Sequence, residues 1–121
     1  MTVYSTRLDI RYQPLELIDV QQLVNDCTDQ WWNQTLCRVN DSVARLGVLQ
    51  GDYHWHIHDN EDEFFFVVEG TLYIDVEGRP TYELSSRKAV TIPRGVRHRP
   101  RAPERVVVLM VEPATVTPTG D

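Results

Sequence analysis

The stretch Gly51–Gly70, GDYHWHIHDNEDEFFFVVEG, contains three of the four histidines of this 121-residue chain. His54, His56 and His58 alternate with apolar residues, a period of two that is typical of a half-buried strand whose alternate side chains share one face. An acidic turn follows, and Glu63 opens a second apolar run. Imidazoles and a carboxylate brought together on facing strands are the components of a metal site.

The composition is that of an ordinary globular protein, with 41% hydrophobic and 25% charged residues. The length predicts a single domain, residues 1–121. A net charge of −6 argues against a nucleic-acid partner, because phosphate binding requires a basic face. The start MTVYSTRLDI lacks the features of a secretory signal, and no apolar run approaches the length of about 20 residues that spans a bilayer. We therefore expect a cytoplasmic protein with no membrane partner, in which Cys27 and Cys37 are unlinked thiols.

The N-terminal part of the chain is expected to form one strand and one helix. Alternating apolar residues over 1–14 indicate a strand, either at a sheet edge or exchanged within a dimer. Asp19 with Gln22 three positions later resembles a capping box, and apolar residues then recur at helical spacing. This pattern predicts a short helix over about 19–28.

From Cys37 onward the period changes to two, and turn residues separate short apolar runs. Such short strands at intervals of about 8–12 residues predict an all-β, antiparallel sandwich or barrel. Within the single domain we expect an N-terminal extension over 1–35, a barrel over about 36–113 and a tail over 114–121 that is either loose or laid across the barrel. The predicted strands are 37–40, 42–49, 52–58, 63–70, 71–78, 80–84, 89–93 and 105–113.

Three of the four histidines are candidate ligands of a single metal ion. His56 and His58 lie two apart on the expected strand, about 7 Å apart at the backbone, and their rings can converge on one ion at about 2.0–2.1 Å each. Glu63 can offer a carboxylate to the same point from the next strand. His98, the remaining histidine, is the candidate for a fourth ligand from another strand.

The same residues resemble the motifs of the cupin superfamily. In its first motif, H-x-H is followed by four residues, Glu, six residues and Gly; His56, His58, Glu63 and Gly70 match this spacing without a gap. The segment 93–98, PRGVRH, matches the P-x-G-x-x-H core of the second motif.

This resemblance implies a small β-barrel of the double-stranded β-helix, or jelly-roll, type. It also implies that one divalent transition metal (Fe, Mn, Ni, Zn or Cu) is bound by His56, His58, Glu63 and His98. The chain further resembles small single-domain cupins labelled mannose-6-phosphate-isomerase-like, including its Glu112-Pro113 ending.

Three positions depart from the cupin pattern. Gly51 lies one position closer to the histidines than the motif has it, Arg87 stands where a glycine is expected, and Ala102 stands where an asparagine is expected. None of them is a metal ligand. They weaken the transfer of any particular family activity to this chain.

Several residues near the motifs have two interpretations. His54 either lines the pocket, as a general base or as a donor to a metal ligand, or lies in water at the barrel mouth. Trp31 and Trp32 either plug one end of the core, or cover a pocket or fill a dimer interface. Glu61 and Asp62 either compete with Glu63 for the metal or form a solvated turn; only Glu63 has the spacing of the cupin motif, so a solvated turn is expected.

The apolar run after Glu63 has an inner and an outer face. Phe65 and Val67 share the parity of Glu63 and are expected to line the pocket. Phe64 and Phe66 then face outward, which predicts a homodimer, because a monomer would expose both aromatic rings. The arginines near His98 form either a solvated basic rim or a group that steers an anionic substrate. They are Arg94, Arg97, Arg99 and Arg101.

A site of three imidazoles and one carboxylate suits several divalent metals and leaves positions open for a ligand. Cupins include dioxygenases, isomerases, lyases, decarboxylases and non-catalytic binders, so the resemblance implies no single reaction. The leading expectation is a metal-dependent enzyme acting on a small polar metabolite that chelates the metal. The alternative is a non-catalytic cupin with a structural metal that binds or senses a small, sugar-like ligand.

Overall fold

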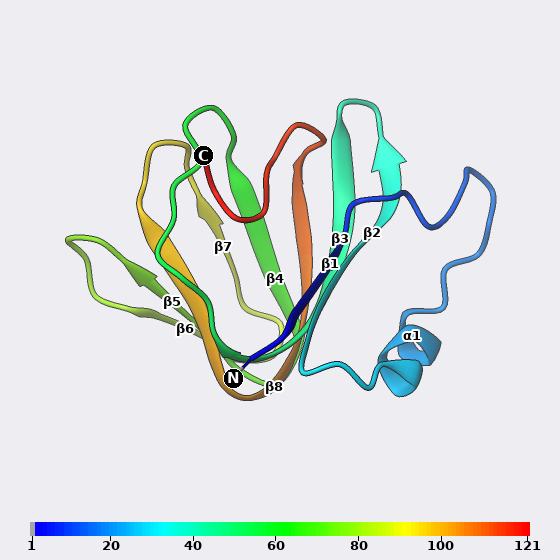
Figure 1. Ribbon diagram of the computed structural model, residues 1–121, viewed down its shortest axis with the longest axis horizontal. Helices are drawn as coiled ribbons and strands as arrows, with labels where there is room; N and C mark the ends of the chain where they lie inside the picture. Colours follow the sequence, from blue (N-terminus) through cyan, green and yellow to red (C-terminus); the bar gives the residue numbers. More distant parts are fainter. Residues whose placement is uncertain (1) are drawn as a thin grey trace.

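The computed structural model describes residues 2–121, in which eight strands curl into an open barrel with one helix outside it (Figure 1). Met1, part of the strand expected over 1–14, lies outside the described residues. The elements are β1 (Tyr4–Arg7), α1 (Val20–Asp26), β2 (Trp31–Val39), β3 (Ser42–Asp52), β4 (Glu63–Glu69), β5 (Leu72–Val76), β6 (Tyr82–Leu84), β7 (Ala89–Ile92) and β8 (His98–Pro113).

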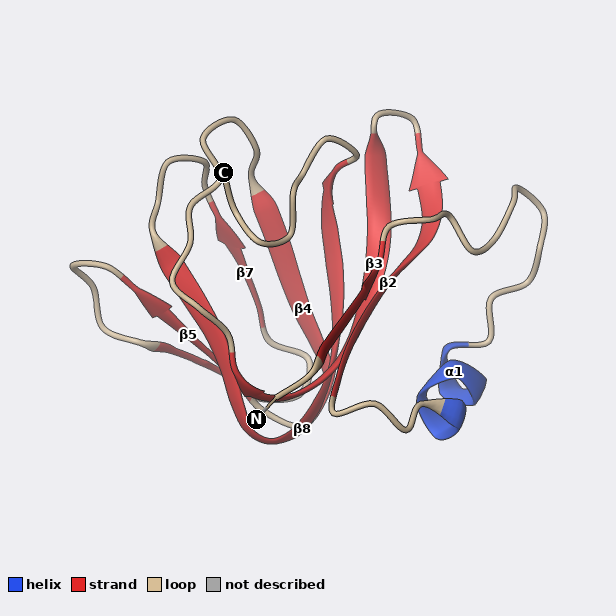
Figure 2. Ribbon diagram, in the orientation of Figure 1, coloured by secondary structure: helices blue, strands red, loops and turns tan. Residues whose placement is uncertain are grey.

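The long strand β8 joins the two halves of the barrel. Its C-terminal half lies between β3 and β4, with Val111 opposite both Ala44 and Phe64. Its N-terminal half pairs with β5, from His98 opposite Val76 to Arg101 opposite Tyr73. The main strand order is β1-β2-β3-β8-β4-β7, and β5 carries β6 on its other edge. The predicted all-β, jelly-roll-like fold is confirmed, and Figure 2 shows how strands dominate it.

The N-terminal predictions hold in part. A strand forms at the sheet edge, but only over Tyr4–Arg7, and it runs parallel to β2. The helix spans Val20–Asp26, and Asp19 caps it by accepting a hydrogen bond from the Gln22 backbone N–H at 3.0 Å. Within residues 2–121 no helix is both long and apolar enough to cross a membrane.

The histidine stretch is not the regular strand that its alternation predicts. The pairing of β3 with β8 shifts register between Leu49 and Gly51, and Gly51 has a φ of 123° that breaks the extended run. Beyond Asp52 the chain continues beside the start of β8 with a single bridge, in which the backbones of His56 and His98 exchange two hydrogen bonds of 2.9 Å. The prediction of a strand over 52–58 is therefore wrong except at its first residue.

Two other strands begin earlier than predicted. Strand β2 starts at Trp31. Its first residues do not show the alternation of apolar and polar residues expected of a strand, because some of its polar residues are buried. Gln34, for example, is buried and its Nε2 donates a hydrogen bond to the Asp9 carbonyl at 2.8 Å. Strand β8 starts at His98, although Pro100 and Pro103 argue against a strand there.

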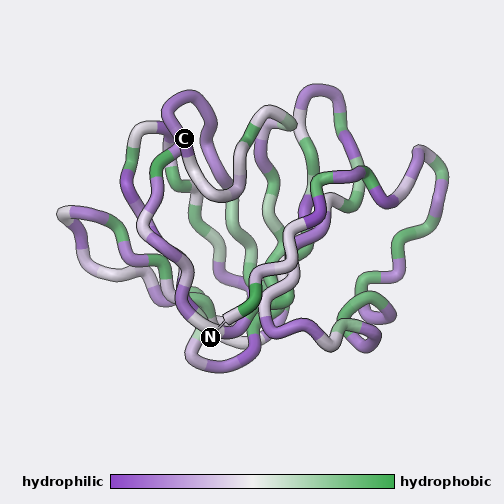
Figure 3. Tube along the Cα trace, viewed as in Figure 1, coloured by the Kyte–Doolittle hydropathy of each residue, from purple (hydrophilic) through white to green (hydrophobic). Residues whose placement is uncertain are grey.

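Neighbouring tryptophans on β2 enter two different clusters. Trp31 (3% exposed) packs inside the barrel, whereas Trp32 (7% exposed) packs on the outer face with Leu23 and Val24 of α1. Both tryptophans are buried in core clusters, and Trp31 also lines a small cavity, so both of its expected roles apply to it in part. Apolar residues follow the strands between polar loops in Figure 3. Cys27 and Cys37 are free thiols, as predicted.

Leu46 tests the outer cluster, because its side chain is fully buried there. The change Leu46→Ala is expected to lower the free energy of unfolding by about 2–5 kcal/mol, from lost burial and the cavity left behind. The control Leu17→Ala, at a site 89% exposed, is expected to change it by no more than about 0.5 kcal/mol. Urea unfolding followed by circular dichroism measures both; equal losses would contradict this packing.

Candidate metal centre

Four side chains of the two motifs meet inside the barrel. His56, His58, Glu63 and His98 each offer one ligand atom, and these atoms all lie within 4.8 Å of one another. His56 and His58 come from the segment after β3, Glu63 is the first residue of β4, and His98 is the first residue of β8. All four are buried, with exposed fractions between 1% and 8%. The fold thus brings together the four side chains that the motifs predict as metal ligands.

Backbone carbonyls orient two of the imidazoles. Nδ1 of His56 lies 3.0 Å from the carbonyl of His54, and Nδ1 of His98 lies 3.0 Å from that of Val96. Because a carbonyl oxygen only accepts hydrogen bonds, each Nδ1 carries a proton, and in the neutral form of such a ring Nε2 has a lone pair. Burial lowers the pKa of His56 to about 4, so this ring is neutral at pH 7, the form that binds metals.

The Nε2 atoms of His58 and His98 face the carboxylate of Glu63. Oε1 of Glu63 lies 3.2 Å from Nε2 of His98 and 3.6 Å from Nε2 of His58. A lone pair so close to a carboxylate oxygen is unfavourable unless a proton or a cation lies between them. The donor set of imidazole nitrogens and one carboxylate oxygen is one that divalent transition metals prefer. The residues therefore fit a metal ion.

Arg45 and Glu112 form a buried polar network beside Glu63, and the sequence motifs did not reveal it. Burial favours the neutral form of Glu63, but its contacts with His98 and Glu112 outweigh this and lower its pKa to about 2. Burial, reinforced by the charge of Glu63, raises the pKa of Glu112. Arg45 Nε lies 3.2 Å from Glu112 and donates to Asn33 at 3.0 Å. The signal was present in the sequence, because Arg45 and Glu112 share the parity of inward-facing residues on their strands.

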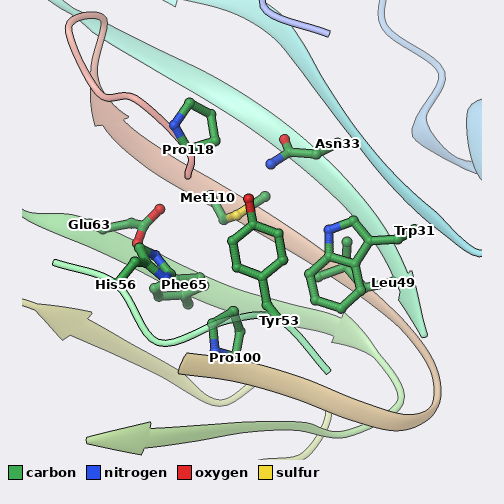
Figure 4. Close-up of a pocket in the computed structure, with 10 residues that line it drawn as sticks. All are labelled: Trp31, Asn33, Leu49, Tyr53, His56, Glu63, Phe65, Pro100, Met110 and Pro118. Atoms are coloured by element: carbon green, nitrogen blue, oxygen red, sulfur yellow. The ribbon is translucent and has the colours of Figure 1, made fainter. Parts of the chain in front are cut away.

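A small cavity of about 30 Å³ opens beside Glu63 and His56 (Figure 4). Its walls are mostly apolar, and the rings of Trp31 and Tyr53 stack in it with centroids 5.2 Å apart. Asn33 contributes an amide, and Pro118 of the tail closes one side. The remaining lining residues are Leu49, Phe65, Pro100 and Met110.

The C-terminal tail lies across the histidine segment, the second of its two expected arrangements. The Asp121 backbone N–H donates to the carbonyl of Ile57 at 2.8 Å, and the Asp59 N–H donates to the Asp121 carboxylate at 2.7 Å. At Gly120, which has a φ of 94°, a Cβ atom would lie 2.6 Å from the Cβ of His56. This close approach requires glycine.

His54 is exposed and belongs to the contact with the tail. Its Nε2 lies 2.8 Å from the carbonyl of Thr119, and its ring lies against Tyr53, with centroids 4.3 Å apart. It is absent from the group of four converging ligand atoms. The structure thus places His54 at the surface, in contact with the tail.

The acidic turn is only partly solvated. Asp62 is exposed, as expected, and accepts a hydrogen bond from the Arg94 backbone N–H at 2.9 Å. Glu61 is 9% exposed, and its Oε2 accepts a hydrogen bond from Thr115 Oγ1 at 2.8 Å. The prediction that Glu61 is solvated is wrong, because the tail covers it.

The apolar run of β4 divides as predicted. Phe65 and Val67 are buried inside the barrel, whereas Phe64 is 36% exposed on the outer face. Phe66 is half-buried.

Three of the four arginines near His98 form ion pairs at the surface. Arg101 and Arg99 lie 2.8 Å and 3.0 Å from Asp75, and Arg97 lies 3.4 Å from Glu77. These acidic partners favour the interpretation as a surface rim over substrate steering.

At one departure from the cupin pattern, the backbone compensates for the residue. Arg87 has a φ of 70°, a left-handed conformation that glycine adopts more readily. The position therefore keeps a backbone conformation typical of glycine without the glycine itself.

Comparisons with known proteins agree with this site. The cupin domain family matches residues 46–112. The uncharacterised protein YdbB of Bacillus subtilis is 39% identical over 90 residues, 74% of this chain and 80% of that protein. A cupin-2 domain containing protein from Shewanella frigidimarina superposes with a TM-score of 0.74 at 30% identity, over 80% of this chain and 94% of that one.

A further solved structure, protein NMB1881 from Neisseria meningitidis, superposes with a TM-score of 0.72 at 26% identity, over 81% of this chain and 99% of that one. The family match spans more than half of the chain and includes all four clustered residues, His56, His58, Glu63 and His98. The chain belongs to the cupin family.

Proposed function

We propose that this protein is a metal-dependent enzyme that acts on a small metabolite which chelates the metal through oxygen atoms. The metal is one divalent transition ion, Fe, Mn, Ni, Zn or Cu, held by His56, His58, Glu63 and His98. The observation that carries the proposal is the buried approach of two imidazole nitrogens to one carboxylate oxygen, at 3.2 and 3.6 Å.

A divalent metal held here would polarise a carbonyl or hydroxyl group of the metabolite, or lower the pKa of a bound water. The protein's own residues prepare the site for it. His56 is neutral at pH 7 because burial lowers its pKa to about 4, so no proton has to leave this ring before it binds. Glu63 contributes the one negative charge, which leaves a divalent site with net positive charge and so favours an anionic or polar oxygen from the ligand.

The cavity refines the expected substrate. Its lining is mostly aromatic and aliphatic, with the amide of Asn33, the hydroxyl of Tyr53 and the indole N–H of Trp31 as polar groups away from the metal ligands, and it suits a compact or planar body attached to the chelating oxygens.

The tail controls the size of ligand that can enter. A cavity of about 30 Å³ has room for about one or two water molecules, so a metabolite requires Pro118 to move away. His54 is bonded to Thr119 of the same tail. The expected role of His54 as general base therefore requires the tail to release its ring.

The second candidate function is a non-catalytic binding or sensing module with a structural metal. The observation that favours it is the narrowness of the cavity, about 30 Å³ with Pro118 on one side, because it leaves little room for substrate and product to exchange. Turnover of any compound in a broad panel of small oxygen-chelating metabolites by the metal-loaded protein would exclude this function. The absence of turnover with every reconstituted metal would favour it over the enzyme.

We also propose that the protein is a cytoplasmic homodimer that buries the outer face of β4 and β8. Phe64 (36% exposed) pairs across the strands with Val111 (38% exposed), and the half-buried Phe66 pairs with Leu109. These four side chains form a continuous apolar stripe of the kind that subunit contacts cover.

Metal content tests the ligand assignment. The changes His56→Ala and His98→Ala are each expected to remove most of the bound metal, because three ligands or fewer then remain. The control His54→Ala removes an exposed histidine two positions away and is expected to retain the metal of the unaltered protein. Plasma mass spectrometry of the purified variants measures this. Full occupancy in both ligand variants would contradict the assignment.

Gly120 tests the closure by the tail. The change Gly120→Val is expected to displace the tail, since a side chain would collide with His56 and the φ of 94° disfavours valine. The control Gly78→Val carries the same backbone strain, with a φ of 78°, but has no atom within 4 Å of the added Cβ. Limited proteolysis of the tail is expected to accelerate only in Gly120→Val; equal rates in both variants would contradict the closure.

Phe64→Lys tests the apolar stripe. The charge is expected to convert a dimer into a monomer, because burying it without a partner is costly. The control Val39→Lys lies outside the stripe at a site 62% exposed and is expected to leave the dimer intact. Light scattering at micromolar concentration measures the mass, and a monomeric unaltered protein would contradict the stripe as an interface.

A further inference from the structure

Glu61, in the turn before β4, is a buried carboxylate with only one of its oxygens engaged. Its Oε2 accepts a hydrogen bond from Thr115 at 2.8 Å, whereas its buried Oε1 has no hydrogen-bond partner among residues 2–121. A buried acceptor without a partner is destabilising, and more so when it is charged. The position of Glu61 therefore requires a compensating interaction.

His58 also has buried polar atoms without hydrogen-bond partners. Its ring is 2% exposed, and neither nitrogen has a hydrogen-bond partner in the described part of the chain. Nδ1 of His56 and Nδ1 of His98, in contrast, are each held by a backbone carbonyl at 3.0 Å. Nε2 of His58 faces Glu63 at 3.6 Å, so Nδ1 is the nitrogen that lacks an orienting acceptor.

The side chains of Glu61 and His58 lie close together. His58, Glu61 and Asp121 each offer one ligand atom, and these three atoms lie within 4.8 Å of one another. Because neither the nitrogens of His58 nor Oε1 of Glu61 forms a direct hydrogen bond, the gap fits one bridging water: two hydrogen bonds of about 2.8 Å that meet at a water span about 4.5 Å. Such a water would have three polar partners, a number typical of buried waters.

We propose that Glu61 is a positioning residue for the metal centre, which orients His58 through one buried water. Oε1 of Glu61 accepts a hydrogen bond from that water, and the water accepts the proton of His58 Nδ1. This arrangement fixes the tautomer that directs Nε2 towards the metal, and the carboxylate makes the ring a stronger ligand. Glu61 thus does for His58 what backbone carbonyls do for His56 and His98.

Glu61 is a better candidate for this role than Asp121. Its carboxylate is buried and retains a free oxygen, whereas the side chain of Asp121 is exposed and already accepts the hydrogen bond from the Asp59 N–H. Thr115 of the tail holds Glu61 in place. The inference rests on the proposed function, because it treats His58 as a metal ligand.

The affinity for Zn²⁺ in competition with a chromophoric chelator tests the proposal. Glu61→Ala is expected to weaken binding by about 10–100-fold, the usual effect of losing a carboxylate behind a ligating histidine. Glu61→Gln, which keeps the shape and an acceptor oxygen, is expected to weaken it by a smaller factor and serves if the alanine variant does not fold. The matched controls Asp59→Ala and Asp59→Asn change an exposed carboxylate of the same turn and are expected to leave the affinity unchanged.

A spectroscopic measurement separates orientation from general stabilisation. In the zinc-loaded protein, the His58 Nδ1–H signal in nitrogen-15 NMR is expected to be protected from exchange, and to lose that protection in Glu61→Ala. Unchanged affinity and protection in both Glu61 variants, with only the thermal stability of the metal-free protein lowered, would overturn the proposal. So would a loss of affinity in Asp121→Asn that the Glu61 variants do not share.

The outcome for the unaltered protein distinguishes this inference from the proposed function. If the unaltered protein binds no zinc, the metal-dependent function fails, and this inference fails with it. If it binds zinc tightly and the Glu61 variants bind equally well, only the role of Glu61 is overturned.

Discussion

The fold is arranged so that hydrogen-bond acceptors face one another in a buried place. Backbone carbonyls fix the protons of His56 and His98 on Nδ1, which directs the lone pairs of Nε2 inward, and His98 then lies 3.2 Å from the carboxylate of Glu63. In water such groups would rotate apart or bind solvent. Inside the barrel they are held, and a cation of suitable size relieves their repulsion.

Three features of the backbone maintain this arrangement. Strand β8 carries His98 at its first residue and continues through both halves of the barrel, so the packing of the core also fixes the position of a ligand. The register of β3 shifts between Leu49 and Gly51, and beyond Asp52 the next segment runs beside His98. The tail then covers that segment, with Gly120 in close contact with His56.

Arg45 and Glu112, which lie beside Glu63, influence which carboxyl group of the site is charged. Arg45 lies 3.2 Å from Glu112, and burial, reinforced by the charge of Glu63, raises the pKa of Glu112, which favours its neutral form beside Glu63. Glu63 thus remains the anionic member of the four-residue group. A buried pair of this kind contributes less to stability than to fixing which group is charged.

Much of this architecture could be predicted from the sequence, because ligand spacing and strand alternation are local signals. The group His56, His58, Glu63 and His98 follows from such spacing, and the inward positions of Phe65 and Val67 follow from parity. The irregular path of residues 53–58 could not be predicted, since it depends on the single bridge to β8 and on the break at Gly51. The burial of Glu61 also escaped prediction, because a segment more than fifty residues away covers it.

X-ray absorption spectroscopy at the edge of the metal that co-purifies with the protein tests the central claim most directly. Multiple scattering from three imidazole rings, together with at least one oxygen ligand at about 2.0–2.2 Å, is the predicted result. A spectrum with sulfur ligands, or with oxygen ligands alone, would contradict this account of the metal centre.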